Sequence, residues 1–207
     1  HDVLASYHPT HTKHHLRDYL VSRRVFTFWV TGAKEDTAPH ADHAAEKALA
    51  ERVFNAAPPD IPVLGWWDAA ELDHGMTEYH GVAWAGSFGK ITLASNWQPN
   101  LSLLSGVPVD MDRVTRQFRA RREVFEPITP QPDTVYLSFV VMESGDSPTY
   151  WQHVQKRVWD DPARGTLPIG WSITPAALDM LPSVAEYYLD NARPQDHFFC
   201  ALSGWGY

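Results

Sequence analysis

The stretch Thr134–Met142, TVYLSFVVM, is the strongest strand signal in the chain. Its nearly continuous apolar character is typical of a parallel strand that is covered on both faces. We expect a helix to follow and to run to Trp159, because Ser147-Pro148 combines a capping serine with a proline suited to the first helical turn. The next apolar run, LPIGWSI at Leu167–Ile173, predicts another strand. Together these segments predict a strand–helix–strand unit of a parallel sheet.

The same alternation continues in both directions along the chain. Further apolar runs predict strands at Val25–Val30, Ile61–Trp67, Ile91–Trp97 and His197–Leu202. Capping residues and apolar residues at helical spacing predict helices after Asp42, after Asp112 and after Thr174-Pro175, the last with a break at Pro182. Six such units suit either a doubly wound sheet or most of a barrel. No G-x-G-x-x-G follows the first strand and no phosphate loop occurs, which counts against nucleotide binding.

We therefore expect an α/β protein with a parallel (β/α) barrel resembling a TIM barrel, incomplete in this chain. A full barrel of this kind typically needs about 250 residues, and the chain has 207. The barrel-like domain is expected over residues 19–207, after a polar, histidine-rich segment at residues 1–18. An open barrel would expose strand edges, so we expect a closing domain or a partner chain at the C-terminal end.

Composition restricts the partners and the cofactors. The chain has 17 Lys plus Arg against 25 Asp plus Glu, a net charge of −8 without a basic run, so we expect no nucleic acid. No apolar stretch approaches the roughly 20 residues of a membrane span, so we expect no membrane. The single cysteine, Cys200, is predicted to be a buried thiol. The histidines near the N-terminus are expected to be solvated, and we predict neither a metal nor a cofactor; they are His8, His11, His14 and His15.

The predicted functional site lies beyond the carboxyl ends of the strands, where parallel α/β folds bind their ligands. Almost every predicted strand is followed there by an aromatic, carboxylate or small polar residue. Aromatic rings can stack on the apolar faces of a sugar while hydroxyl and amide groups bond its edges, so the pattern predicts a carbohydrate cleft. For any single tryptophan the alternative is a place in the core. The predicted substrate-binding residues are Trp67, Asn96, Trp97, Trp171, Ser203, Trp205 and Tyr207.

Three carboxylates are candidates for catalysis. Glu143 and Asp146 follow the strongest strand at a spacing of three residues, and Asp68 follows the strand at Ile61–Trp67. Glycoside hydrolysis commonly uses two carboxylates, one protonated as acid and the other ionised as base or nucleophile. The alternative for Asp146 and Asp68 is to cap the segments that follow them. We predict Asp146 and Glu143 as the catalytic pair, with Asp68 in reserve.

From about Tyr19 onward the chain resembles the GxGYxYP family of putative glycoside hydrolases. The residues that carry the resemblance are GWSITP at Gly170–Pro175 and the motif Gly204–Tyr207, and its specific part extends from Val135 to Tyr207. The resemblance implies a secreted or periplasmic bacterial enzyme that acts on glycans. Where the family has an acidic residue before its Gly-Asp pair and an Asn after it, this chain has Ser144 and Ser147. That departure leaves open an alternative, a carbohydrate-binding protein on a barrel scaffold without catalysis.

Overall fold

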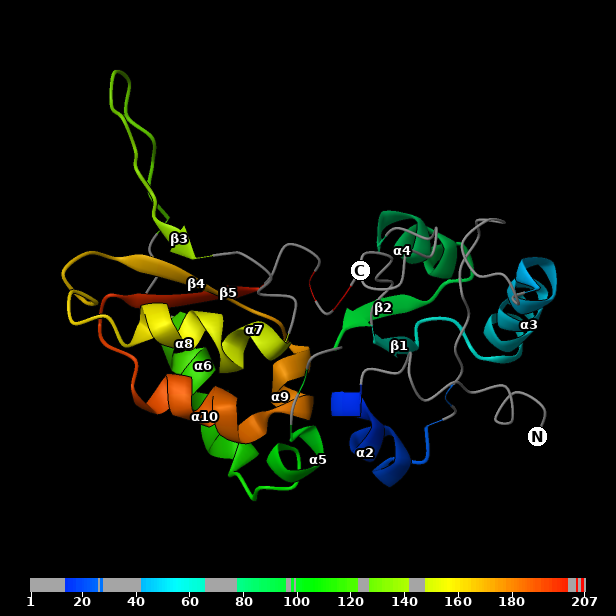
Figure 1. Ribbon diagram of the computed structural model, residues 1–207. Coiled ribbons are helices and arrows are strands. Elements are labelled where there is room, and N and C mark those ends of the chain that lie inside the picture. Colours follow the sequence, from blue (N-terminus) through cyan, green and yellow to red (C-terminus); the bar gives the residue numbers. More distant parts are fainter. Residues whose placement is uncertain are drawn as a thin grey trace. The chain divides into compact units, whose positions relative to one another are not determined.

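The computed structural model describes residues 14–25, 27, 42–65, 78–95, 98, 100–122, 127–141, 148–200, 204 and 206. The chain divides into two compact units, and Figure 1 shows the elements of each. Unit 1 comprises His1–Ser102 together with Gly206–Tyr207, and unit 2 comprises Leu103–Trp205. The division falls inside the predicted domain of residues 19–207.

Unit 1 contains a parallel pair of strands joined through a helix. Its described elements are α2 (His14–Ser22), α3 (His43–Ala56), β1 (Pro62–Gly65), α4 (Glu78–Ser87) and β2 (Ile91–Ala94). As predicted, Asp42 caps α3, its side chain accepting a hydrogen bond from the Ala45 amide at 2.9 Å. The core of the unit includes Phe54, whose ring packs edge-on against Trp84 with the centroids 5.4 Å apart.

Unit 2 contains a three-stranded parallel sheet in the order β3-β4-β5. After α5 (Leu101–Leu104), which spans the division, its elements are α6 (Met111–Arg122), β3 (Val140–Val141), α7 (Pro148–Gln152), α8 (Val154–Trp159), β4 (Ile169–Ile173), α9 (Ala176–Met180), α10 (Pro182–Asp190) and β5 (Asp196–Cys200). The helices α6, α7, α8 and α10 gather on one side of this sheet (Figure 1).

The helix limits follow local signals closely. The predicted break at Pro182 separates α9 from α10, and the helix predicted to run to Trp159 is divided into α7 and α8 at His153. Capping of α6 differs from the prediction. Asp110, not Asp112, accepts the hydrogen bond from the Arg113 amide at 2.9 Å, because the helix begins two residues earlier than predicted, at Met111.

The predicted barrel is wrong. In the described part of the chain the strands form one sheet of two strands and another of three, and the strand orders β1-β2 and β3-β4-β5 are both open. Strand–helix alternation and parallel pairing are common to open sheets and barrels. Closure depends on the tilt and stagger of the strands around a common axis, and the local apolar pattern does not encode these quantities.

Two strand predictions also need correction. Of the described residues 134–141 in the predicted strand Thr134–Met142, only Val140–Val141 form a strand, and the preceding residues are exposed, with Val135 at 91% and Leu137 at 76%. The predicted C-terminal strand exists as β5, at the end of the strand order of the described residues, and Cys200 at its last position is exposed rather than buried as predicted. The strand predicted at Val25–Val30 lies mostly outside the described residues.

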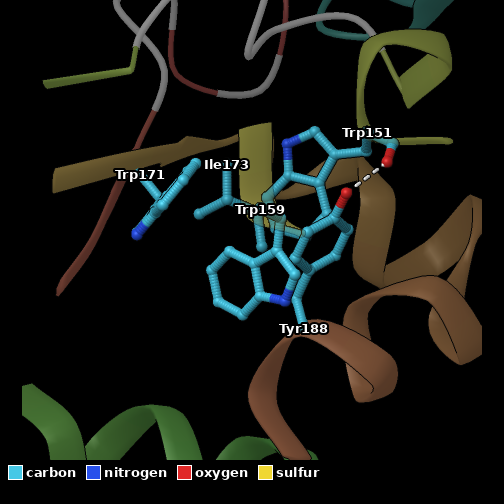
Figure 2. Close-up of a cluster of buried hydrophobic side chains, with 5 residues drawn as sticks. All are labelled: Trp151, Trp159, Trp171, Ile173 and Tyr188. Atoms are coloured by element: carbon cyan, nitrogen blue, oxygen red, sulfur yellow. Dashed lines mark hydrogen bonds between the residues drawn. The ribbon is translucent and has the colours of Figure 1, made fainter. Parts of the chain in front are cut away.

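An aromatic cluster forms the core of unit 2 (Figure 2). Trp159 is its centre, since its ring lies edge-on at 4.9 Å from both Trp171 and Tyr188. Trp151 packs on Tyr188 at 4.6 Å, and its backbone carbonyl accepts a hydrogen bond from the Tyr188 hydroxyl at 2.5 Å. Edge-to-face rings at such distances are worth about 0.5–1.5 kcal/mol per pair beyond their buried area. The cluster therefore holds α7, α8 and α10 against β4.

Candidate functional site

The carboxyl edge of the unit 2 sheet is the first part of the predicted site. β3 ends at Val141 and α7 begins at Pro148, so residues 142–147, which include Glu143 and Asp146, connect two described elements. Glu143 and Asp146 themselves lie outside the described residues, as does Ser203 after β5.

The central strand β4 brings polar groups to that edge. Ser172 and Thr174 at its carboxyl end are both fully buried. The Thr174 hydroxyl accepts a hydrogen bond from the Ala176 amide at 3.3 Å and so helps to start α9. The Trp151 indole donates to the Ser172 carbonyl at 3.1 Å, whereas the Ser172 hydroxyl has no hydrogen-bond partner among the described residues. A buried hydroxyl without a partner is costly. The other polar groups described at this edge make hydrogen bonds that stabilise the fold, whereas the Ser172 hydroxyl makes none.

Trp171 is the one predicted substrate-binding residue that the structure describes. Its ring is fully buried and packs on Trp159, and its indole nitrogen donates to the Asp196 carboxylate at 2.9 Å. Because neither face of the ring is open, we remove Trp171 from the predicted stacking residues. Its signal in the sequence, an aromatic residue near a strand end, is the same for a core position and for a binding position.

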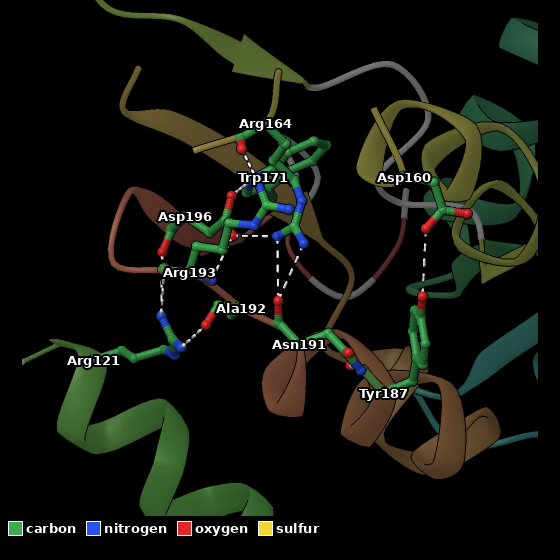
Figure 3. A network of polar contacts seen from close by, with 9 residues as sticks. All are labelled: Arg121, Asp160, Arg164, Trp171, Tyr187, Asn191, Ala192, Arg193 and Asp196. Atoms are coloured by element: carbon green, nitrogen blue, oxygen red, sulfur yellow. Dashed lines mark hydrogen bonds and ion pairs between the residues drawn. The ribbon is translucent and has the colours of Figure 1, made fainter. Parts of the chain in front are cut away.

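The most extensive polar network in the described residues surrounds Asp196 (Figure 3). Its carboxylate accepts hydrogen bonds from the Trp171 indole, from the Arg193 amide at 2.7 Å and from the Arg164 guanidinium, which stacks at 3.9 Å over Trp159. Arg121 from α6 donates to carbonyl oxygens of the same segment, including that of Ala192 at 3.1 Å. Sequence reasoning missed this network.

The position of the Asp196 network assigns it to stability. Asp196 stands opposite Ile169 at the amino ends of β5 and β4, whereas ligands of parallel α/β sheets bind at the carboxyl ends. Removing one partner of a buried ion pair is strongly destabilising. The network therefore holds the amino ends of β4 and β5 together, and we do not include it in the candidate site.

The carboxyl edge of the unit 1 sheet is the second part of the predicted site. The Gly65 amide at the end of β1 donates to the Ser95 hydroxyl at 2.8 Å, and that hydroxyl donates to the Leu93 carbonyl at 3.0 Å. This buried serine ties the ends of β1 and β2 together just before the predicted site residues. Those residues lie outside the described part of the chain; they are Trp67, Asp68, Asn96 and Trp97.

Tyr79 is an aromatic residue near this edge that sequence reasoning missed. It lies in the first turn of α4, is 76% exposed, and packs edge-on against His80 with the ring centroids 5.7 Å apart. α4 connects two parallel strands, so it runs back against them and its first turn lies toward their carboxyl ends. An exposed ring in that place is suited to stacking on a sugar.

The glycines of the C-terminal motif have different surroundings. Gly204 has a φ of +65°, which glycine adopts readily, and a Cβ there would meet nothing within 4 Å. At Gly206 a Cβ would lie 2.8 Å from the Thr92 carbonyl oxygen and 2.9 Å from Ile91 Cγ2 of β2. The second glycine of the motif therefore allows a close backbone approach within unit 1. The neighbouring predicted residues Trp205 and Tyr207 lie outside the described part of the chain.

The pKa shifts found in the described residues belong to side chains of the helices α6, α8 and α10. Burial raises the pKa of the Tyr188 hydroxyl, and nearby Tyr187 and Asp160 add to the effect. Asp190 has a lowered pKa because Arg113 hydrogen-bonds to its carboxylate. Within the described ranges no three His, Cys, Asp or Glu side chains are placed to hold a metal ion, and no helix is long and apolar enough to cross a membrane.

Comparison with known proteins places the chain in a family. The model of the GxGYxYP third domain matches residues 1–106, and that of the GxGYxYP putative glycoside hydrolase C-terminal domain matches residues 133–207. A crystal structure of a putative hydrolase from Bacteroides thetaiotaomicron is similar at a TM-score of 0.71 and 23% identity, over 94% of this chain and 33% of that one. This likeness supports the fold, and the chain spans a third of that hydrolase's length. No curated protein matches the chain. The two family models together show that the chain belongs to the GxGYxYP family.

Proposed function

We propose that this chain provides active-site residues of a glycoside hydrolase that acts on a polysaccharide or an oligosaccharide. The observation that carries the proposal is the family match. The glycoside hydrolase description belongs to the C-terminal domain, and that domain covers Glu143, Asp146 and the Gly204–Tyr207 motif. The parallel sheets support it, since the candidate residues follow the carboxyl ends of their strands in the sequence.

Glu143 and Asp146 are the proposed acid and base or nucleophile, with Asp68 in reserve. In glycoside hydrolysis one carboxylic acid protonates the leaving oxygen, while the other carboxylate activates water or attacks the anomeric carbon. Carboxyl groups about 5–5.5 Å apart give retention of the anomeric configuration, and groups about 6.5–9.5 Å apart give inversion. The anomer released first, observed by NMR, therefore reports their separation.

Aromatic and small polar residues are proposed to hold the sugar. Tyr79 joins the set because its ring is exposed in the first turn of α4, and Trp171 leaves it because its ring is buried. The proposed substrate-binding residues are Trp67, Tyr79, Asn96, Trp97, Ser203, Trp205 and Tyr207. We also propose that the enzyme is secreted or periplasmic, as the family resemblance implied.

The experiment is an assay of reducing-sugar release from a panel of polysaccharides, together with affinity electrophoresis on the same glycans. We expect Asp146→Asn or Glu143→Gln to lower turnover by at least about 100-fold and to leave glycan binding intact. The matched control Asp112→Asn, which removes an exposed carboxylate of α6, should keep wild-type turnover. Tyr79→Ala should raise KM and leave kcat unchanged.

The same assay separates the alternative function. Ser144 and Ser147 depart from the family pattern, and a binding protein without catalysis would bind glycans but release no sugar from any of them. Wild-type turnover in both Asp146→Asn and Glu143→Gln would refute the proposed catalytic pair.

A further inference from the structure

Ser172 carries a buried hydroxyl that the fold leaves without a hydrogen bond. It is the fourth of the five residues of β4, the central strand of the unit 2 sheet, and it is fully buried. Its hydroxyl has no hydrogen-bond partner in the part of the chain that the structure describes. A buried polar group that makes no bond lowers stability, and alanine in the same place would avoid that cost. The described contacts therefore give this hydroxyl no structural role.

Ser95 shows the opposite case at the carboxyl edge of the other sheet. It directly follows β2 and is also fully buried. Its hydroxyl accepts a hydrogen bond from the Gly65 amide at 2.8 Å and donates one to the Leu93 carbonyl at 3.0 Å. Ser95 thus joins two strands, whereas the Ser172 hydroxyl joins nothing.

The Ser172 side chain points away from the aromatic core. Its neighbours Trp171 and Ile173 belong to that core (Figure 2), and successive side chains of a strand point to opposite faces. On the other face Ser172 stands opposite Phe199 of β5. A Cβ at Gly170, two residues before Ser172, would lie 3.1 Å from the Phe199 ring. The hydroxyl is thus excluded from water beside an aromatic residue, where a hydrogen bond is stronger than in water.

The strand register indicates which acceptor this hydroxyl serves. Val141, the last residue of β3, pairs with Trp171, the residue directly before Ser172. Glu143 is the second residue after Val141 in the sequence and belongs to the proposed catalytic pair. A carboxylate forms stronger hydrogen bonds with a hydroxyl than a neutral acceptor does. Catalytic hydrogen bonds are often made only when the substrate is bound, so a hydroxyl without a partner in the free enzyme fits such a role.

We propose that Ser172 is a positioning residue of the glycosidase site, and that its hydroxyl donates a hydrogen bond to the Glu143 carboxylate when substrate is bound. The bond orients the carboxylate and favours its ionised form. It therefore assigns Glu143 the part of base or nucleophile and leaves the part of acid to Asp146. This inference rests on the proposed function.

The first test is kinetic and uses the glycan that the wild type cleaves. Ser172→Ala should lower kcat at least about tenfold, the loss expected for one hydrogen bond to a charged group, and should leave KM unchanged. In Glu143→Gln the carboxylate is already gone. Adding Ser172→Ala to that variant should therefore change kcat by less than about twofold, because the two residues act through one bond.

The second test separates positioning from a structural role by amide hydrogen exchange. Ser172→Ala should leave exchange in β4 unchanged or make it slower, because it removes a buried group that makes no bond. The matched control Ser95→Ala removes a buried serine that makes two bonds, and it should accelerate exchange in β2 at least about fivefold.

Three results would overturn the inference. They are wild-type kcat in Ser172→Ala, a further tenfold loss when Ser172→Ala is added to Glu143→Gln, and faster exchange in β4 of Ser172→Ala. The double comparison also separates this inference from the proposed function. If Glu143→Gln loses turnover and Ser172→Ala does not, the role of Ser172 alone is refuted, whereas wild-type turnover in Glu143→Gln refutes both.

Discussion

Replacing Asp196 by Asn tests how much of the stability of unit 2 depends on one buried carboxylate. The side chain of Asp196 is 1% exposed and that of Arg164 is 8% exposed. Asp196 accepts hydrogen bonds from Arg164, from the Trp171 indole at 2.9 Å and from the Arg193 amide at 2.7 Å. Asn has a similar shape, but it has no charge, and its amide nitrogen would face a donor instead of an acceptor.

The expected loss follows from the buried arginine that remains. Breaking a buried ion pair by removing one partner costs about 3–5 kcal/mol, because the other charge stays desolvated. In a cooperative unit of about 100 residues, 1 kcal/mol shifts the melting temperature by about 4–8 °C. Asp196→Asn should therefore lower the melting temperature of unit 2 by at least about 12 °C.

Tryptophan fluorescence during urea and thermal unfolding is the assay, because Trp151, Trp159 and Trp171 are all buried in unit 2. The matched control is Asp160→Asn, which removes the carboxylate of an exposed pair with Lys156 on α8 and should leave the unfolding midpoint nearly unchanged. If Asp196→Asn and Asp160→Asn unfold at the same urea concentration, the Asp196 network does not stabilise the sheet as argued.

Two further predictions concern unit 1 and the acid stability of unit 2. Gly206→Ala should destabilise unit 1 by about 1–3 kcal/mol, since its methyl group would meet the backbone oxygen of Thr92. Amide hydrogen exchange in β2 should accelerate in this variant. The control is Gly86→Ala on α4, where the space around the glycine is open, and it should not accelerate that exchange. Because Arg113 lowers the pKa of Asp190 in the folded state, the stability from this pair is present above the unfolded pKa, about 4, and is lost as the pH falls through the lower folded value. In urea unfolding from pH 6 to pH 2, the free energy of unfolding should fall less steeply with decreasing pH in Asp190→Asn than in the wild type. An equally steep fall in both would refute the contribution of the Arg113–Asp190 pair to acid stability.

The candidate site was predictable from the sequence only as a set of positions. The segment Gly170–Pro175 and the Gly204–Tyr207 motif pointed to the family, and the family models bear that out. The choice between core and site was not predictable for Trp171, since that choice depends on whether Trp159 covers the ring. Tyr79 was missed because a lone tyrosine at the start of a helix carries no periodic signal, and its exposure is a tertiary property.

The sequence by itself determined the local elements, because their signals act over three or four residues. Asp42 caps α3 through an amide three residues away, and Pro182 divides two helices because proline cannot continue one. Tertiary structure alone decided that the described strands form two open sheets, that residues 134–140 are exposed, and that Asp196 meets Arg164 across 32 positions of the chain. These outcomes depend on strand register and on which surfaces meet in space, and a run of apolar residues such as TVYLSFVVM reads the same whether or not another surface covers it.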